Sequence, residues 1–192
     1  MRQKTSVNME YHTERLIMKI LTPDYLREVL AFQLRNKELF ERYEPTRPEN
    51  FYTLSYQQAV LKYELKLAMK LNTIRFYVFR KEDPQTIIGT VCLHEVNRSA
   101  YSCSEVGYKF DAAWHHRGYA REALVKTLEI AFGTLGLHRV FARVMPENKP
   151  SMRLLEGLGF LYEGIEHDCI LIQGKWEDHL RYALISPFSP HS

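Results

Sequence analysis

Residues 114–124 read WHHRGYAREAL and carry the strongest structural signal in the sequence. It follows a predicted strand that ends near Phe110, and a predicted helix begins within it near Tyr119. Gly118 and Ala120 are small, so a ligand can come close to the backbone there. The first N–H groups of a helix lack partners within the helix, and the helix dipole favours negative charge at this end. The stretch therefore predicts a turn that binds an anion such as a pyrophosphate.

Arg117 and Arg121 add fixed positive charge to this turn. The turn differs from a P-loop, because no G-x-x-x-x-G-K-[ST] run is present, and it has no G-x-G-x-x-G spacing. The spacing alone leaves an alternative open, which is an ordinary loop carrying two structural arginines on a solvated surface.

Hydrophobic periodicity on both sides of the turn predicts a mixed α/β (α+β) fold. Strands are expected at residues 13–20, 74–80, 86–96, 101–110, 138–144, 160–172 and 175–185, and helices at residues 22–40, 51–72, 119–133 and 149–158. This order predicts one central, mostly antiparallel sheet of about seven strands, flanked by about four helices. A β–α–β crossover within residues 101–144 makes one strand pair parallel.

The length of 192 residues fits one domain. We expect a flexible N-terminus over residues 1–12, a single domain over residues 13–186 and a short tail over residues 187–192. The first residues lack the apolar run of a secretory signal, and no stretch approaches the length of a membrane span. We therefore expect no membrane association. Three cysteines form no C-x-x-C pair, which indicates reduced thiols in a cytoplasmic protein.

The net charge of +3 is too small to indicate nucleic-acid binding by itself. Its location is more informative than its size. Residues 115–153 contain seven basic and three acidic residues, a net +4, so the positive excess surrounds the predicted anion site. We therefore expect no nucleic-acid partner and a small anionic ligand instead.

The turn resembles motif A of the GNAT superfamily of N-acetyltransferases, [Q/R]-x-x-G-x-[G/A], with His115 where the family usually has Gln or Arg. Further segments resemble the ribosomal-protein N-terminal (Rim-type) branch: TERLIMKILTPDYL, EVGYKF, LHRVFARVMPENKPSMRLLEGLGF and YEGIEHDCILIQGKWEDHLRYAL. The resemblance covers roughly residues 13–185 and is weakest over residues 36–75. The motifs occurring together in this order are specific, whereas a lone R-x-x-G is not.

This resemblance implies a GNAT fold, in which the two strands that flank motif A and its helix splay apart around acetyl-CoA. The pyrophosphate would bind to the turn, and backbone groups of the preceding strand would pair with the pantetheine. The residues implied in binding acetyl-CoA are Gly107, Tyr108, Lys109, Phe110, His115, His116, Arg117, Gly118, Tyr119, Ala120 and Asn148. Because backbone donors dominate such a turn, His115 and His116 leave the cradle intact. No third ligand accompanies the two histidines, so no metal is expected.

The resemblance also implies direct transfer of the acetyl group to a primary amine in a ternary complex. Glu105, near the start of the motif A strand, is the candidate general base, directly or through water, with Glu95 a weaker candidate. Asn148 and Ser151 match the N-x-x-S of the Rim-type branch. Asn148 would contact the pantetheine or help to hold the splayed strands, and Ser151 would hydrogen-bond or protonate the leaving thiolate. The alternatives are a solvated Glu105, and a helix start in which Asn148 is the cap and Ser151 lies in the first turn.

The acceptor is predicted to meet the least family-like region, residues 40–71. Tyrosines there would wall a cleft for a protein N-terminal amine or a small amine, and glutamates in and beside this region would attract a cationic amine, although packing and solvation explain them more simply: Tyr43, Tyr52, Tyr56, Tyr63, Glu38, Glu41, Glu44 and Glu49. The alternative function is a non-catalytic acyl-CoA-binding or regulatory module that keeps the fold. A monomer or a homodimer is expected.

Overall fold

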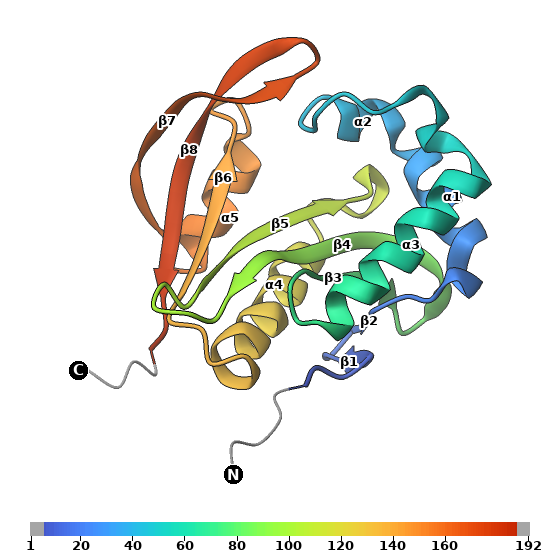
Figure 1. The fold of residues 1–192 in the computed structure, drawn as a ribbon, viewed down its shortest axis with the longest axis horizontal. Helices are drawn as coiled ribbons and strands as arrows, with labels where there is room; N and C mark the ends of the chain where they lie inside the picture. The colour runs from blue at the N-terminus through green and yellow to red at the C-terminus, as the bar shows by residue number, and fades with distance from the viewer. Residues whose placement is uncertain (1–5, 188–192) are drawn as a thin grey trace.

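The computed structural model describes residues 6–187, so the ends of the predicted N-terminal segment and tail (residues 1–5 and 188–192) lie outside the described residues. Eight strands form one sheet in the order β1-β2-β3-β4-β5-β6-β8-β7 (Figure 1). The strands are β1 (Glu10–His12), β2 (Leu16–Lys19), β3 (Ile74–Arg80), β4 (Asp83–Asn97), β5 (Cys103–Phe110), β6 (Arg139–Val144), β7 (Leu161–Ile172) and β8 (Lys175–Ile185). The α-helices are α1 (Leu26–Arg35), α2 (Lys37–Glu41), α3 (Leu54–Met69), α4 (Tyr119–Glu129) and α5 (Lys149–Gly157). Among these residues, no helix is long and apolar enough to span a membrane.

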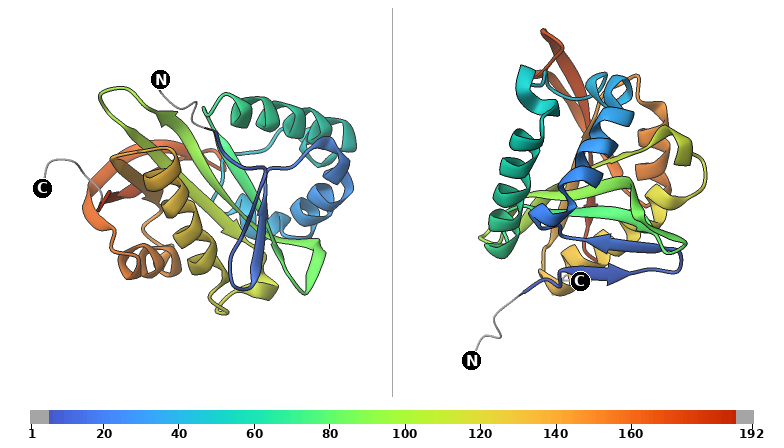
Figure 2. Two further views of the ribbon diagram at one scale, coloured as in Figure 1. Left: turned by 90° about the horizontal axis from the view of Figure 1, so that it is seen from below. Right: turned by 90° about the vertical axis from the view of Figure 1, so that its right-hand side faces the viewer.

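The helices cover both faces of the sheet, with α1 and α3 on one face and α4 and α5 on the other (Figure 2). Alternation along β3 explains the two layers, because successive side chains point to opposite faces. Tyr77 and Phe79 pack in a cluster with residues of α1 and α3 such as Phe32. Phe76 and Val78 belong to the larger cluster that contains residues of α4 and α5.

The predicted mixed, mostly antiparallel sheet is confirmed, and so is its one parallel pair, β5 with β6. The strand number differs from the expected seven, because β1 lies inside the segment expected to be flexible and pairs with β2. The helix number also differs: the helix expected to run to residue 40 is interrupted at Asn36, whose side-chain amide donates to the carbonyl of Phe32 at 3.0 Å.

The pairing of β5 with β6 is short, and it determines the shape of the sheet. Within residues 6–187 it covers three positions, from Cys103 with Arg139 to Glu105 with Phe141. Beyond these positions β5 stays paired with β4 as far as Phe110, while β6 stays paired with β8. The two halves of the sheet therefore diverge after Glu105 (Figure 1).

Candidate active site

The edge of β5 that faces β6 offers backbone groups beyond Glu105 that no neighbouring strand pairs within the described residues. Unpaired backbone groups along a strand edge are free to hydrogen-bond, and an extended ligand with amide groups can supply their partners. The side chains of β5 alternate between the two faces. Lys109 contacts Gln33 of α1, whereas Tyr108 contacts Ser151 of α5. Residues beside the opening therefore contact α1 on one face of the sheet and α5 on the other.

The turn before α4 has the geometry of an anion site. Gly118, the N-cap of α4, adopts a φ of +81°, which glycine tolerates best. The first hydrogen bond of the helix runs from the N–H of Glu122 to the carbonyl of Gly118 at 3.0 Å. The N–H groups of Tyr119, Ala120 and Arg121 precede it, so they lack intrahelical acceptors and are available to an anion.

The two histidines of the turn have different surroundings. The ring Nε2 of His115 lies 2.9 Å from the carbonyl oxygen of Phe110, so this side chain ties the turn to the end of β5. His116 is exposed and has a φ of +59°. His115 therefore helps to fix the shape of the turn. Its side chain is bonded to the protein backbone, which is compatible with an anion cradle formed mainly by backbone groups.

Cationic side chains surround the turn. The guanidinium groups of Arg117 and Arg80 lie 4.9 Å and 3.9 Å from the ring centroid of Trp114. Trp114 thus holds the guanidinium of Arg117, one of the cations of the positive segment 115–153, in the turn before α4. Arg80 is also paired with Glu82 and Asp83.

The first turn of α5 brings two hydroxyl groups together at the opening. The side-chain carbonyl of Asn148 accepts from the N–H of Ser151 at 3.2 Å, so Asn148 caps the helix. The Oγ of Ser151 lies 2.7 Å from the phenol oxygen of Tyr108. Burial raises the pKa of Tyr108 to about 12, with the Ser151 bond opposing this rise, so the phenol keeps its proton at neutral pH. Sequence reasoning assigned only the backbone of Tyr108; strand alternation could have placed its side chain on the α5 face.

Glu105 lies where the opening begins. Its Oε2 is 2.5 Å from Nη1 of Arg143, and Nε of Arg143 is 2.6 Å from a carboxylate oxygen of Glu166 on β7. Burial raises the pKa of Glu105 above its usual value, although Arg143 opposes this rise. A carboxylate with a raised pKa beside a gap is suited to accept a proton. Glu95, by contrast, is exposed beside a register irregularity of β4.

His94 lies beside Glu105 and was not among the site residues predicted from the sequence. It is opposite Glu105 in the β4–β5 register, and its Nε2 lies 3.2 Å from the position that a Cβ on Gly107 would occupy. Burial, assisted by the positive charge of Arg75, lowers the pKa of His94 to about 4. The imidazole is therefore neutral at physiological pH. The sequence alone could not indicate this residue, because its position opposite Glu105 depends on the register of the β4–β5 hairpin.

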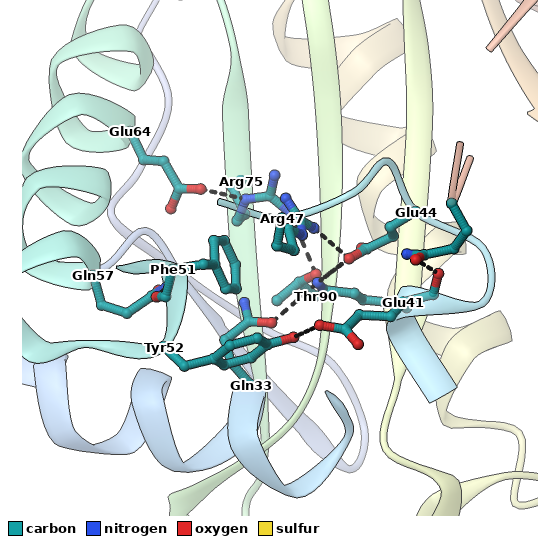
Figure 3. Close-up of polar contacts among 12 residues, drawn as sticks. Gln33, Glu41, Glu44, Arg47, Phe51, Tyr52, Gln57, Glu64, Arg75 and Thr90 are labelled. Carbon is teal, nitrogen blue, oxygen red and sulfur yellow. Dashed lines mark hydrogen bonds and ion pairs between the residues drawn. The ribbon is translucent and has the colours of Figure 1, made fainter. Parts of the chain in front are cut away.

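Carboxylates on the α1–α3 side are paired within the protein (Figure 3). Glu44 contacts Lys109 at 2.8 Å and also Arg47, while Glu64 contacts Arg75 at 2.6 Å. Burial lowers the pKa of Lys109 to about 8, although Glu44 opposes this effect. The side chain of Lys109 therefore contacts α1 and the segment after α2, and only its backbone is placed to line the opening.

Other residues near α2 are also bonded within the protein. Tyr52 donates to Glu41 at 2.8 Å, and the amide of Gln173, in the β7–β8 turn, donates to the carbonyl of Glu41 at 3.0 Å. The segment around α2 and the β7–β8 turn therefore meet across the α1–α3 face. Tyr63, which was expected to line an acceptor site, is 60% exposed on α3.

A sheet that splays beside a glycine-capped, cationic helix start defines an acetyltransferase of the GNAT class. The chain belongs to this family, because residues 15–161 match the acetyltransferase (GNAT) domain. It is 37% identical to the probable N-acetyltransferase YjcK of Bacillus subtilis over 83% of this chain and 88% of that protein. It is 30% identical to the ribosomal protein uS5-alanine N-acetyltransferase of Escherichia coli over 91% of this chain and 90% of that protein.

Solved structures have the same fold. The ribosomal-protein-S5-alanine acetyltransferase of Vibrio fischeri superposes with a TM-score of 0.88 at 26% identity, over 94% of this chain and 98% of that chain. RimJ of Mycobacterium smegmatis, solved with CoA-disulfide, superposes with a TM-score of 0.84 at 22% identity, over 92% of this chain and 85% of that chain. The enzyme class and the GNAT fold expected from the sequence are confirmed.

The neutral state of His94 makes stability depend on pH. Its pKa is about 4 in the folded protein against 6.5 for an ordinary histidine, so the unfolded chain binds more protons between these values. Stability contributed by this group is therefore complete above pH 6.5 and is lost as the pH falls towards 4. We expect His94→Gln to flatten this part of the curve, by up to about 3 kcal/mol, in urea unfolding at pH 7 and 4.5. Identical pH slopes for the two proteins would contradict this assignment.

Proposed function

We propose that this protein transfers the acetyl group of acetyl-CoA directly to a protein N-terminal amine in a ternary complex. The observation that carries the proposal is the opening of the sheet after Glu105, directly beside the cationic turn capped by Gly118. The strand edge offers backbone partners to the pantetheine amides, and the turn offers N–H groups to the pyrophosphate. Gly107, Tyr108, Lys109 and Phe110 contribute backbone groups, and residues 115–120 form the turn. Holding both substrates side by side supplies much of the rate.

The chemistry requires a neutral amine and a protonated leaving group. The amine nitrogen attacks the thioester carbon, the C–N bond forms, and the C–S bond breaks. We assign removal of the amine proton to Glu105, directly or through water, because its raised pKa and its position at the start of the opening suit a base. We assign proton donation to the thiolate to Ser151, supported by Tyr108 at 2.7 Å. Asn148 orients Ser151 by capping α5.

Charge pairing on the α1–α3 face supports an acceptor with a single amine. Glu44 and Glu64 each contact a lysine or an arginine of this chain. A polycation such as a polyamine would have to displace these cations to reach the carboxylates, whereas one α-amine needs only one base.

The three unbridged cysteines fit a reducing compartment and so support a cytoplasmic location.

The function is tested by identifying the product. The protein is incubated with acetyl-CoA and an equimolar panel of alanine-, serine- and methionine-initiated peptides, spermidine and lysine, and thiol release and products are measured by mass spectrometry. We expect acetylation on the peptide α-amine, with N-terminally blocked peptides as the control. Acetylation of spermidine in preference to every peptide would contradict the acceptor assignment. Tight CoA binding without turnover of any amine would contradict the activity.

The two hydroxyl groups at the opening are tested by a double-mutant cycle. Ser151→Ala is expected to lower kcat by about 10- to 100-fold with little change in acetyl-CoA affinity, because general acids typically contribute factors of this order or larger. Tyr108→Phe alone should have a smaller effect, and in the Ser151→Ala background it should have almost none. Additive effects on log kcat would show that the hydroxyls act separately, and an unchanged rate in Ser151→Ala would make Ser151 a helix-start residue only.

A further inference from the structure

The segment TER, residues 13–15, contacts the phosphate-binding turn from a distant part of the chain. The hydroxyl of Thr13 donates to Oε1 of Glu122 at 2.5 Å, and the backbone N–H of Arg15 donates to the same oxygen at 2.8 Å. Nε of Arg15 donates to Oε2 of Glu122 at 2.7 Å. Both carboxylate oxygens of Glu122, in the first turn of α4, are therefore held by residues 13–15, which we call the N-terminal strap.

The guanidinium of Arg15 continues from Glu122 onto the turn itself. Its Nη1 donates to the carbonyl of Arg117 at 3.0 Å, and its central carbon lies 4.6 Å from the ring centroid of Tyr119. Its Nη2 lies 3.3 Å from the position that a Cβ on Gly118 would occupy. One arginine thus contacts Arg117 and Tyr119 of the turn and Glu122 in the first turn of α4.

These contacts determine where the donors of the turn point. In a trans peptide the carbonyl of one residue and the N–H of the next point in opposite directions. Because Arg15 holds the carbonyl of Arg117, the N–H of Gly118 points away from Arg15. The bonds to Glu122 hold the first turn of α4, which carries the free N–H groups of Tyr119 to Arg121. Burial of Glu122 raises its pKa, but the hydrogen bonds from Thr13 and Arg15 outweigh this, so it remains ionised.

We propose that Thr13 and Arg15 are positioning residues that orient the backbone N–H groups of residues 118–121 towards the pyrophosphate of CoA. The proposal rests on the assignment of this turn to CoA. The strap acts through the backbone of the turn, since Nε and Nη1 of Arg15 are already bonded to Glu122 and Arg117.

Two variants separate positioning from simple charge. Arg15→Ala removes a positive charge near the ligand, and Glu122→Gln removes a negative one. Long-range electrostatics alone predicts weaker CoA binding for Arg15→Ala and tighter binding for Glu122→Gln. The strap predicts weaker binding for both, by about tenfold for Arg15→Ala, the equivalent of one strong hydrogen bond. Arg27→Ala is the matched control, because Arg27 is exposed on α1.

The experiment measures dissociation constants by calorimetry for CoA and dephospho-CoA, together with kcat/KM for acetyl-pantetheine, a donor without a diphosphate. We expect equal fold losses for CoA and dephospho-CoA, an intermediate loss for Arg15→Lys, and unchanged acetyl-pantetheine kinetics. Tighter CoA binding by Glu122→Gln would overturn the proposal. So would a loss confined to CoA, which would place Arg15 on the 3′-phosphate, and so would an equal loss with acetyl-pantetheine, which would mean general damage. Wild-type protein that fails to bind CoA would instead refute the proposed function.

Discussion

The parallel pairing of β5 with β6 ends at Glu105 and Phe141, and the candidate site is built around this interruption. A β5 edge that continued to pair with β6 would leave no backbone groups for a ligand. Instead β5 remains held by β4 on its other edge, and β6 remains held by β8. The protein thus keeps an open strand edge inside an otherwise continuous sheet, next to a helix start that attracts anions.

Ionic contacts fix the positions of side chains beside the opening. On one side, Glu166 of β7 accepts from Arg143 and Arg181, and Arg143 also reaches Glu105. The pairs are partly exposed, so each contributes little to stability by itself, and their effect is to fix side-chain positions. The N-terminal strap has the same role at the phosphate turn. The candidate site residues therefore depend on contacts from the N-terminal strap, β6, β7 and β8.

The fold was largely predictable because local patterns and the motif around Gly118 agree, whereas the contact of Ser151 with Tyr108 of β5 was not predicted. The strand that the sequence did not predict, β1, is short and polar, and its extended conformation depends on pairing with β2. The contacts of Tyr108 with Ser151 and of Arg15 with Glu122 join residues 43 and 107 positions apart. Such pairs arise from packing between elements, and the periodicity of a single segment carries no information about this packing. The neutral His94 likewise depends on burial under neighbouring groups.

We propose that acetyl-CoA occupies the opening of β5 and the turn before α4. Amide hydrogen exchange, measured residue by residue by NMR with and without CoA, tests it most directly, with amides of α3 as the internal reference. We predict that CoA protects the β6-facing amides within residues 107–110 and the amides of residues 118–121, and leaves α3 unchanged. Saturating CoA that protects neither segment, or that protects only residues elsewhere in the sheet, would contradict the account.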